Sequence, residues 1–274
     1  MRTIEGFVEL SDGARLRYDI GGEGPDVVLL HPGLWDRRTW DRQMETFAAA
    51  GFRVTRYDAR GYGESSRPTG APYSHVRDLE QLMNELEIGS AALVGCSMGG
   101  GNELDFTLEH PDRVWALVAV AAGLGGFEAF EEEEDWWEAA NEPVEEAVAA
   151  GDLERAQDAR LAIWAPLGTD DAAGARIREL AFANLHELTM DESALEELDP
   201  PAAARLSEID VPTLVLEAEH DPPFSRRESK LIADGVLDAR LVVIEGADHV
   251  INLRQPERFD EAVLAFLNEV RPAG

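Results

Sequence analysis

The chain of 274 residues has a single cysteine, Cys96, which excludes an intrachain disulfide and any metal site built from cysteine alone. Basic residues are also scarce, since 24 lysines and arginines accompany 55 aspartates and glutamates, for a formal net charge of −31. A surface of this charge repels nucleic-acid backbones and anionic lipid headgroups. We therefore expect no nucleic-acid partner and no membrane partner.

Long apolar runs are missing as well. No stretch approaches the length of a membrane span, and the first ten residues carry Glu5 and Glu9 where a signal peptide would be basic and then apolar. These features favour a cytoplasmic protein. The chain does have ample core material, because 45% of its residues are hydrophobic and 29% are charged, a balance typical of a globular protein.

Short apolar runs alternate with helical stretches along most of the chain. Two β-rich runs at 3–10 and 14–20 flank Ser11-Asp12-Gly13, the composition of a tight turn, and predict an N-terminal hairpin. The run 26–31 is continuously apolar at its centre, as in a strand buried on both faces of a parallel sheet. Further strands are expected at 52–57, 91–94, 114–121, 213–217 and 240–244, with helices at 37–50, 74–86 and 97–109. This order predicts an α/β fold with a doubly wound, mostly parallel, eight-stranded sheet.

The alternation stops at residues 127–199, which contain no convincing strand but several helical stretches, including 143–150 and 153–164. By composition this segment holds 22 acidic residues and 4 arginines, so it carries more than half of the net charge. We therefore divide the chain into a core of residues 1–126 and 200–274 and a helical cap inserted at 127–199. Its most acidic run, 131–135, is interpreted as a solvated surface loop in preference to a cation site.

One motif indicates chemistry. Gly95-Cys96-Ser97-Met98-Gly99 joins the expected strand 91–94 to the expected helix 97–109. A serine at such a sharp turn has a strained backbone, and a Cβ two residues to either side would collide with the turn. The helix N-terminus also favours developing negative charge there. The sequence thus predicts Ser97 as a nucleophile, with Cys96 a small buried hydrophobe beside it.

With this motif after the fifth strand and an insert after the sixth, the chain resembles the α/β-hydrolase fold family over essentially its whole length. Within this family, the sequence is similar to the serine hydrolase branch, which includes 3-oxoadipate enol-lactonases, small esterases and cofactor-free haloperoxidase-type enzymes. The resemblance implies that the acid is Asp221, after the seventh strand, and that the base is His249, in the terminal histidine loop. The order Ser97, Asp221, His249 is the order that this fold uses.

The resemblance also covers two loops. His31-Pro32-Gly33-Leu34 lies where the family has its oxyanion-hole loop, which implies that the backbone amides of Gly33 and Met98 bind the oxyanion, with the amide of Leu34 as the alternative to Gly33. Residues 57–65 resemble the family's Asp-x-Arg-Gly-x-Gly-x-Ser loop, which we interpret as scaffolding.

These parts define acyl transfer without a cofactor, on a small-molecule substrate. Because the acidic cap would repel anions, we expect a neutral ester or lactone. The alternatives are a carbon-carbon bond hydrolase or perhydrolase with the same triad, and a non-catalytic ligand-binding protein of this fold. The sequence leaves open whether the chain forms a homo-oligomer.

The candidate substrate-binding residues are Leu34, Trp136, Trp164 and His186. For the tryptophans of the cap, packing inside the cap is the first interpretation and an aromatic lid over the pocket is the second. For His186, a packed or exposed structural role is the other interpretation.

Overall fold

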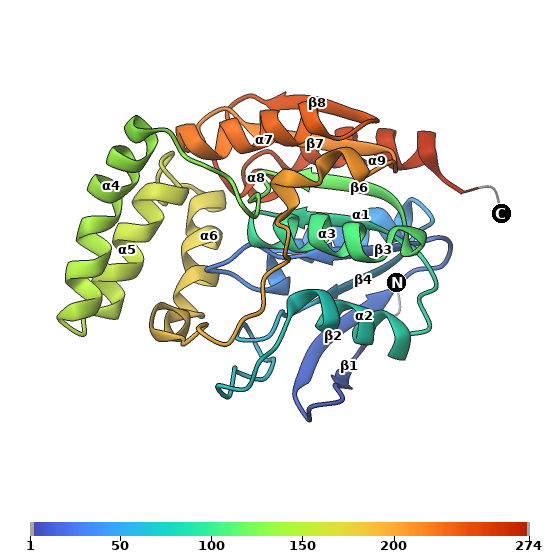
Figure 1. The fold of residues 1–274 in the computed structure, drawn as a ribbon, viewed down its shortest axis with the longest axis horizontal. Helices are drawn as coiled ribbons and strands as arrows, with labels where there is room; N and C mark the ends of the chain where they lie inside the picture. Colours follow the sequence, from blue (N-terminus) through green and yellow to red (C-terminus); the bar gives the residue numbers. More distant parts are fainter. Residues whose placement is uncertain (1–2, 273–274) are drawn as a thin grey trace.

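In the computed structural model, which describes residues 3–272, eight strands form one sheet with helices on both faces (Figure 1). The spatial order is β1-β2-β4-β3-β5-β6-β7-β8; β1 and β2 are antiparallel to their neighbours and the other strands are parallel. The strands are β1 Thr3–Glu9, β2 Arg15–Gly21, β3 Asp26–Leu30, β4 Arg53–Tyr57, β5 Ala91–Cys96, β6 Val114–Val120, β7 Thr213–Ala218 and β8 Ala239–Ile244. The predicted fold class is confirmed, and each expected strand lies within two residues of its predicted bounds.

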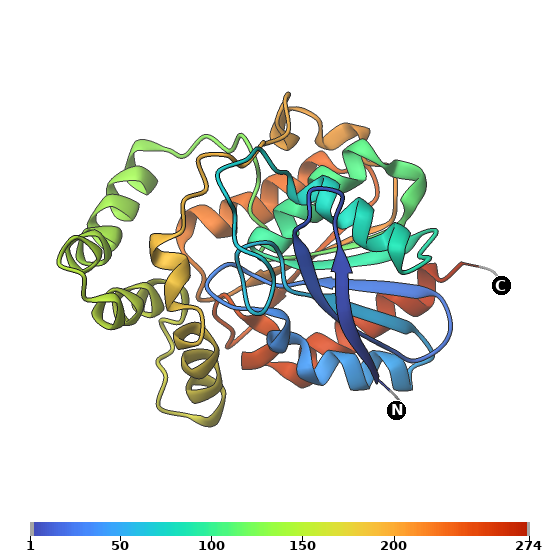
Figure 2. The same cartoon turned by 90° about the horizontal axis from the view of Figure 1, so that it is seen from below.

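Alternating side chains of the central strands divide the core into two layers. Val27 and Leu29 of β3 pack under α1 and α9, whereas Val28 and Leu30 pack under α2, α3 and α7 on the opposite face (Figure 2). These helices are α1 Asp41–Ala49, α2 His75–Glu85, α3 Met98–Glu109, α7 Pro223–Gly235 and α9 Pro256–Val270, with the short α8 Ile251–Arg254 before the last. Across residues 3–272, no helix has the length and apolar character needed to span a bilayer.

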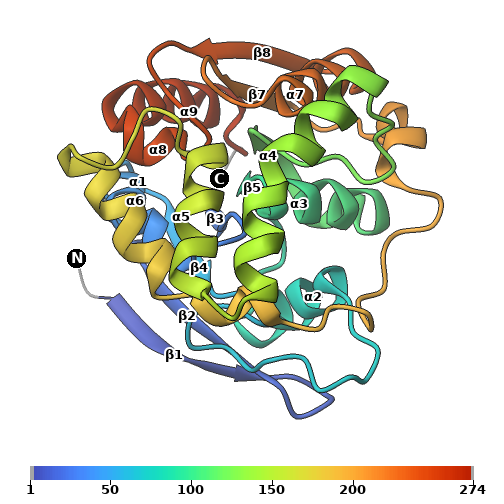
Figure 3. The ribbon, with the colours of Figure 1, turned by 90° about the vertical axis from the view of Figure 1, so that its left-hand side faces the viewer.

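Three helices lie between β6 and β7: α4 Glu131–Ala149, α5 Leu153–Trp164 and α6 Ala172–Phe182. Figure 3 shows α4 and α5 crossing one end of the sheet. Apart from one bridge pair between Leu195 and Tyr73, residues 127–199, all of them described, contain no β-structure. These helices lie over the edge of the sheet at which the parallel strands end (Figures 1 and 3).

The acidic run 131–135 is not a loop, so that interpretation was wrong: it forms the first turns of α4. Carboxylates in the first turn interact favourably with the positive end of the helix dipole. Glu133 also accepts a hydrogen bond from the Phe130 N–H at 2.8 Å and pairs with Arg227 of α7 at 2.6 Å. The contact with Arg227 lowers the pKa of Glu133 below its ordinary value.

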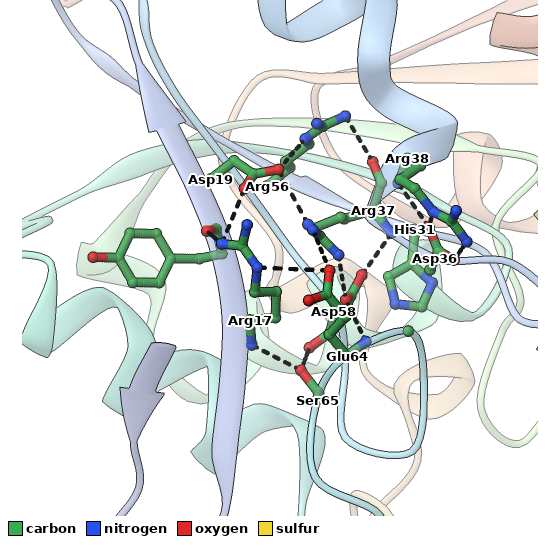
Figure 4. A network of polar contacts seen from close by, with 12 residues as sticks. Arg17, Asp19, His31, Asp36, Arg37, Arg38, Arg56, Asp58, Glu64 and Ser65 are labelled. Atoms are coloured by element: carbon green, nitrogen blue, oxygen red, sulfur yellow. Dashed lines mark hydrogen bonds and ion pairs between the residues drawn. The ribbon is translucent and has the colours of Figure 1, made fainter. Parts of the chain in front are cut away.

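A buried ion-pair network ties the sheet to the loop after β4 (Figure 4). Arg37, in the 3₁₀ turn Arg37–Trp40, is 6% exposed and donates to Asp19 at 3.1 Å, Asp58 at 2.6 Å and Glu64 at 2.8 Å. Asp19 belongs to β2, while Asp58 and Glu64 belong to the loop 58–65. One guanidinium thus holds together three segments that lie far apart in the sequence.

Replacement of Arg37 by methionine should lower the free energy of unfolding by about 3–5 kcal/mol, because it leaves the buried carboxylate of Asp58 without its ion-pair partner. Arg155→Met is the matched control: Arg155 pairs with Glu146 at 3.4 Å, and both side chains are more than half exposed. That change should cost less than about 1 kcal/mol. Urea unfolding of the two variants measures the difference, and equal losses would contradict a dominant role for the network.

Candidate active site

Ser97 stands at the turn between β5 and α3, with φ 52° and ψ −115°. Two glycines make this left-handed conformation sterically accessible: a Cβ on Gly95 would lie 2.4 Å from the Gly99 carbonyl oxygen, and one on Gly99 would lie 2.3 Å from that of Leu30. The Ser97 N–H donates to the Val120 carbonyl at 3.0 Å, which fixes the turn against β6. The sequence thus builds a rigid, strained position for one hydroxyl.

Asp221 follows β7 and His249 follows β8, so both come from the same edge of the sheet as Ser97. The Nδ1 atom of His249 lies 2.8 Å from Oδ1 of Asp221, and both side chains are buried. With its proton on Nδ1, the imidazole donates to the carboxylate and keeps Nε2 free to accept a proton. The other carboxylate oxygen of Asp221 accepts a hydrogen bond from the Ser225 hydroxyl at 2.9 Å.

Ser97 and His249 both line a cavity of about 310 Å³ beneath the helices α4 and α5. The indole of Trp164 covers the imidazole of His249, with ring centroids 4.3 Å apart. The remaining lining residues are Gly33, Leu34, Trp35, Tyr62, His75, Met98, Asn102, Trp137, Arg160, Glu187, Glu192 and Leu195. The cavity therefore has an aromatic and aliphatic side and a polar side.

Two of the predicted substrate-binding residues do not line this cavity. The helix α4 presents Trp137 to it, while Trp136 packs against Phe224 with ring centroids 5.9 Å apart. The Nε2 atom of His186 lies 2.8 Å from the Gly61 carbonyl oxygen, so this side chain binds backbone. Leu34 and Trp164 do line the cavity, and their contact with substrate stays a prediction.

The loop 31–34 brings Gly33 next to the start of α3. A Cβ on Gly33 would lie 3.9 Å from the Cβ of Met98, and Leu34 has a φ of 67°. The Ala59 N–H donates to Nε2 of His31 at 2.9 Å, so Nδ1 of the same ring carries the proton that the Pro32 carbonyl accepts at 2.8 Å. This neutral histidine fixes the loop at both of its ring nitrogens, and burial lowers its pKa.

Sequence reasoning missed a second carboxyl group near His249, beside that of Asp221. Glu228 of α7 is 9% exposed and accepts a hydrogen bond from the Leu124 N–H at 3.1 Å. Burial raises its pKa to about 7, while the positive charge on a protonated His249 acts in the opposite direction. No motif marks this residue, because only the packing of α7 places it here.

A hydroxyl and an imidazole thus line the cavity, and the imidazole is bonded to a buried carboxylate, a set suited to nucleophilic attack on a carbonyl carbon. Within residues 3–272, no group of three or more histidine, cysteine, aspartate or glutamate side chains is arranged to hold a metal ion.

Comparison with known proteins gives one family match: the model of the alpha/beta hydrolase fold matches residues 26–156. Among curated proteins, a 2-hydroxy-6-oxononadienedioate/2-hydroxy-6-oxononatrienedioate hydrolase of Paraburkholderia xenovorans is 27% identical over 278 residues. The alignment covers 95% of this chain and 94% of the relative.

Two solved structures share the architecture over nearly their whole length. A bromoperoxidase from Bacillus anthracis superposes with a TM-score of 0.76 at 25% identity, covering 97% of this chain and all of the other. Est816, described as an N-acyl homoserine lactone degrading enzyme, superposes with a TM-score of 0.72 at 27% identity, covering 95% of this chain and all of the other.

Proposed function

Because the chain belongs to the α/β-hydrolase superfamily and is an enzyme, we propose that it is a serine hydrolase that cleaves a neutral carboxylic ester or lactone. The observation that carries the proposal is the meeting of Ser97 and His249 on one cavity, with His249 Nδ1 2.8 Å from Asp221. Nucleophile, base and orienting acid thus occupy one site.

In the proposed reaction, the Ser97 hydroxyl oxygen attacks the acyl carbon and its proton passes to Nε2 of His249. The carbonyl electron pair moves to oxygen, where the amides of Gly33 and Met98 stabilise the negative charge. The intermediate then collapses, and the leaving alkoxide takes the proton from His249. A water molecule attacks the acyl-enzyme by the same steps and releases the carboxylic acid, so no external oxidant or reductant takes part.

Residues 127–199 act as the cap of this proposed site. Trp137 of α4 and Trp164 of α5 line the cavity and cover part of it. Exclusion of water strengthens the electrostatic interactions inside the cavity.

The charges on the cavity wall favour a neutral substrate. Arg160 is the one lysine or arginine among the described residues that line it, and Glu187 accepts a hydrogen bond from its guanidinium at 3.1 Å. Glu192 adds a further carboxylate to the wall. A substrate carboxylate would therefore meet negative charge with no free cation to bind it.

The Paraburkholderia relative, which acts on a dioate, and the bromoperoxidase suggest alternatives with the same triad. A carbon-carbon bond hydrolase would use Ser97 and His249 on a diketone, and a perhydrolase would replace water by peroxide. The lactone-degrading neighbour and the acidic cavity wall favour a neutral lactone or ester over a dioate.

The test is a panel of p-nitrophenyl esters of graded acyl length, with lactones and a diketone alongside, incubated with the purified protein. Saturable ester or lactone hydrolysis supports the proposal. Turnover of the diketone alone would favour the carbon-carbon hydrolase, and stoichiometric labelling by a fluorophosphonate with no turnover of any substrate would favour a ligand-binding protein.

Because the cap is acidic, we expect the charge of the substrate to change kcat/KM. We expect kcat/KM for the p-nitrophenyl monoester of glutaric acid to be at least tenfold below that for p-nitrophenyl pentanoate at low salt. The ratio of anionic to neutral ester should rise several-fold as NaCl is added, because about 0.1 M salt screens charges beyond roughly 10 Å. Glu192→Gln should raise the same ratio at low salt. A ratio that does not respond to salt would show that the carboxylates do not act on the cavity.

A further inference from the structure

One polar side chain on the cavity wall has no role in the mechanism above. Tyr62 lies in the loop between β4 and α2 and lines the cavity, and its side chain is 3% exposed. No group within the described residues 3–272 forms a hydrogen bond with its hydroxyl. Its oxygen is not among the fully buried unpaired atoms, so the hydroxyl opens on the cavity and is available to a molecule there.

The hydroxyl lies beside Gly33, one of the two residues whose amides are assigned to the oxyanion hole, and Met98 lies on another side of that glycine. A Cβ on Gly33 would lie 3.8 Å from Oη of Tyr62 and 3.9 Å from the Cβ of Met98. The Tyr62 ring also meets His31 edge-on, with centroids 5.2 Å apart. Three segments of the chain thus converge next to Ser97.

The cap holds the loop of Tyr62 from both sides. Before it, the Gly61 carbonyl binds Nε2 of His186 at 2.8 Å; after it, the Gly63 N–H donates to the Asn184 side chain at 2.9 Å. Gly63 has a φ of 51°, and a Cβ there would lie 2.2 Å from a carboxylate oxygen of Asp58. The phenol is therefore held in place before substrate binds, as an effective donor in catalysis must be.

The phenol also keeps its proton. Burial raises the pKa of Tyr62 well above its ordinary value, and the nearby carboxylates of Glu187 and Glu192 raise it further. A neutral hydroxyl can donate one hydrogen bond to a negatively charged oxygen.

We propose that Tyr62 is a catalytic residue whose hydroxyl donates a hydrogen bond to the substrate carbonyl oxygen as that oxygen becomes an oxyanion. It is the third donor, beside the amides of Gly33 and Met98, and its proton stays on Oη throughout. This inference rests on the proposed function, because acyl transfer to Ser97 creates the oxyanion.

The test is Tyr62→Phe, which removes the hydroxyl and keeps the ring. We expect kcat for the best ester of the panel to fall by about a hundredfold with KM within twofold of wild type, because the bond strengthens only in the transition state. Affinity for an alkyl boronic acid, whose tetrahedral adduct with Ser97 is negatively charged, should fall by the same factor as kcat/KM. Thermal unfolding of the variant checks that it is folded.

Tyr73→Phe is the matched control. Tyr73 is a second buried phenol whose hydroxyl has no hydrogen-bond partner in the described residues, but it does not line the cavity of Ser97. Its variant should keep wild-type kcat and boronate affinity. Tyr62→Phe with unchanged kcat, or with a raised KM alone, would overturn the inference and leave the serine mechanism intact. Wild-type protein that neither hydrolyses esters nor binds the boronate would overturn both.

Discussion

Ser97→Ala should lower kcat for ester hydrolysis by about 10⁶-fold, because the structure offers no second nucleophile at the apex of the turn. Alanine keeps the Cβ and the backbone, so the fold should be unchanged. The variant should also lose the mass increase that a fluorophosphonate gives to the wild-type protein. Activity within a hundredfold of wild type would rule out the serine mechanism.

The neighbouring cysteine supplies the control for this experiment. Cys96 is fully buried, its Sγ lies 3.6 Å from the His249 carbonyl oxygen, and burial raises the pKa of its thiol well above the ordinary value. The thiol is thus protonated and a poor nucleophile. The fluorophosphonate should label Cys96→Ala fully. Loss of labelling in this variant, with labelling kept in Ser97→Ala, would show that Cys96 is the nucleophile.

Asp221→Asn should lower kcat by about 10⁴-fold. Asparagine carries no negative charge, and its amide N–H can donate to Nδ1 of His249, so the imidazole loses its correct tautomer and the stabilisation of its positive charge. Rates measured for the best ester of the panel at pH 8 compare this variant with wild type.

Glu228→Gln tells apart the two buried carboxyl groups near His249. Burial raises the pKa of Glu228 to about 7, but pH 8 lies above this value, so the side chain is mostly ionised there. The substitution therefore removes a charge of the same sign as that of Asp221. Glu228→Gln should nevertheless stay within tenfold of wild type, because the carboxyl group that bonds to Nδ1 is that of Asp221. If kcat fell strongly in Glu228→Gln but stayed near wild type in Asp221→Asn, Glu228 would be the acid instead of Asp221.

Features fixed by short stretches of sequence could be predicted. The central strands are continuous apolar runs because both of their faces are covered, and the turn of Ser97 needs glycine at 95 and 99, where any Cβ would strike backbone. The positions of Asp221 and His249 followed from chain order within a family resemblance, and the structure brings these two side chains together.

Features fixed by contacts between residues far apart in the sequence could not be predicted. The first turn of α4 is paired with Arg227 of the distant α7, and without the helix phase the sequence could not tell that Trp137 rather than Trp136 faces the cavity. His186 was a candidate for substrate contact because nothing in its neighbourhood shows that the Gly61 carbonyl lies within 2.8 Å. Tyr62 was assigned to scaffolding for the same reason.

The helices over the cavity contact the rest of the protein through different interactions on their two sides. On the α6 side, the Trp35 indole donates to the Ile177 carbonyl at 2.9 Å, Asn184 donates to Asp36 at 2.9 Å, and Arg254 donates to the Gly168 carbonyl at 2.7 Å. On the α4 side, the fastenings are the aromatic contacts with Phe224 and the single guanidinium of Arg227.

Separation at α6 would break the two buried hydrogen bonds of Trp35 and Asn184 together, whereas separation between α4 and α7 would break the contacts of one arginine and move aromatic rings past one another. The contacts between α4 and α7, where Trp137, Trp164 and Phe224 line a second cavity, are therefore the less costly of the two sets to break.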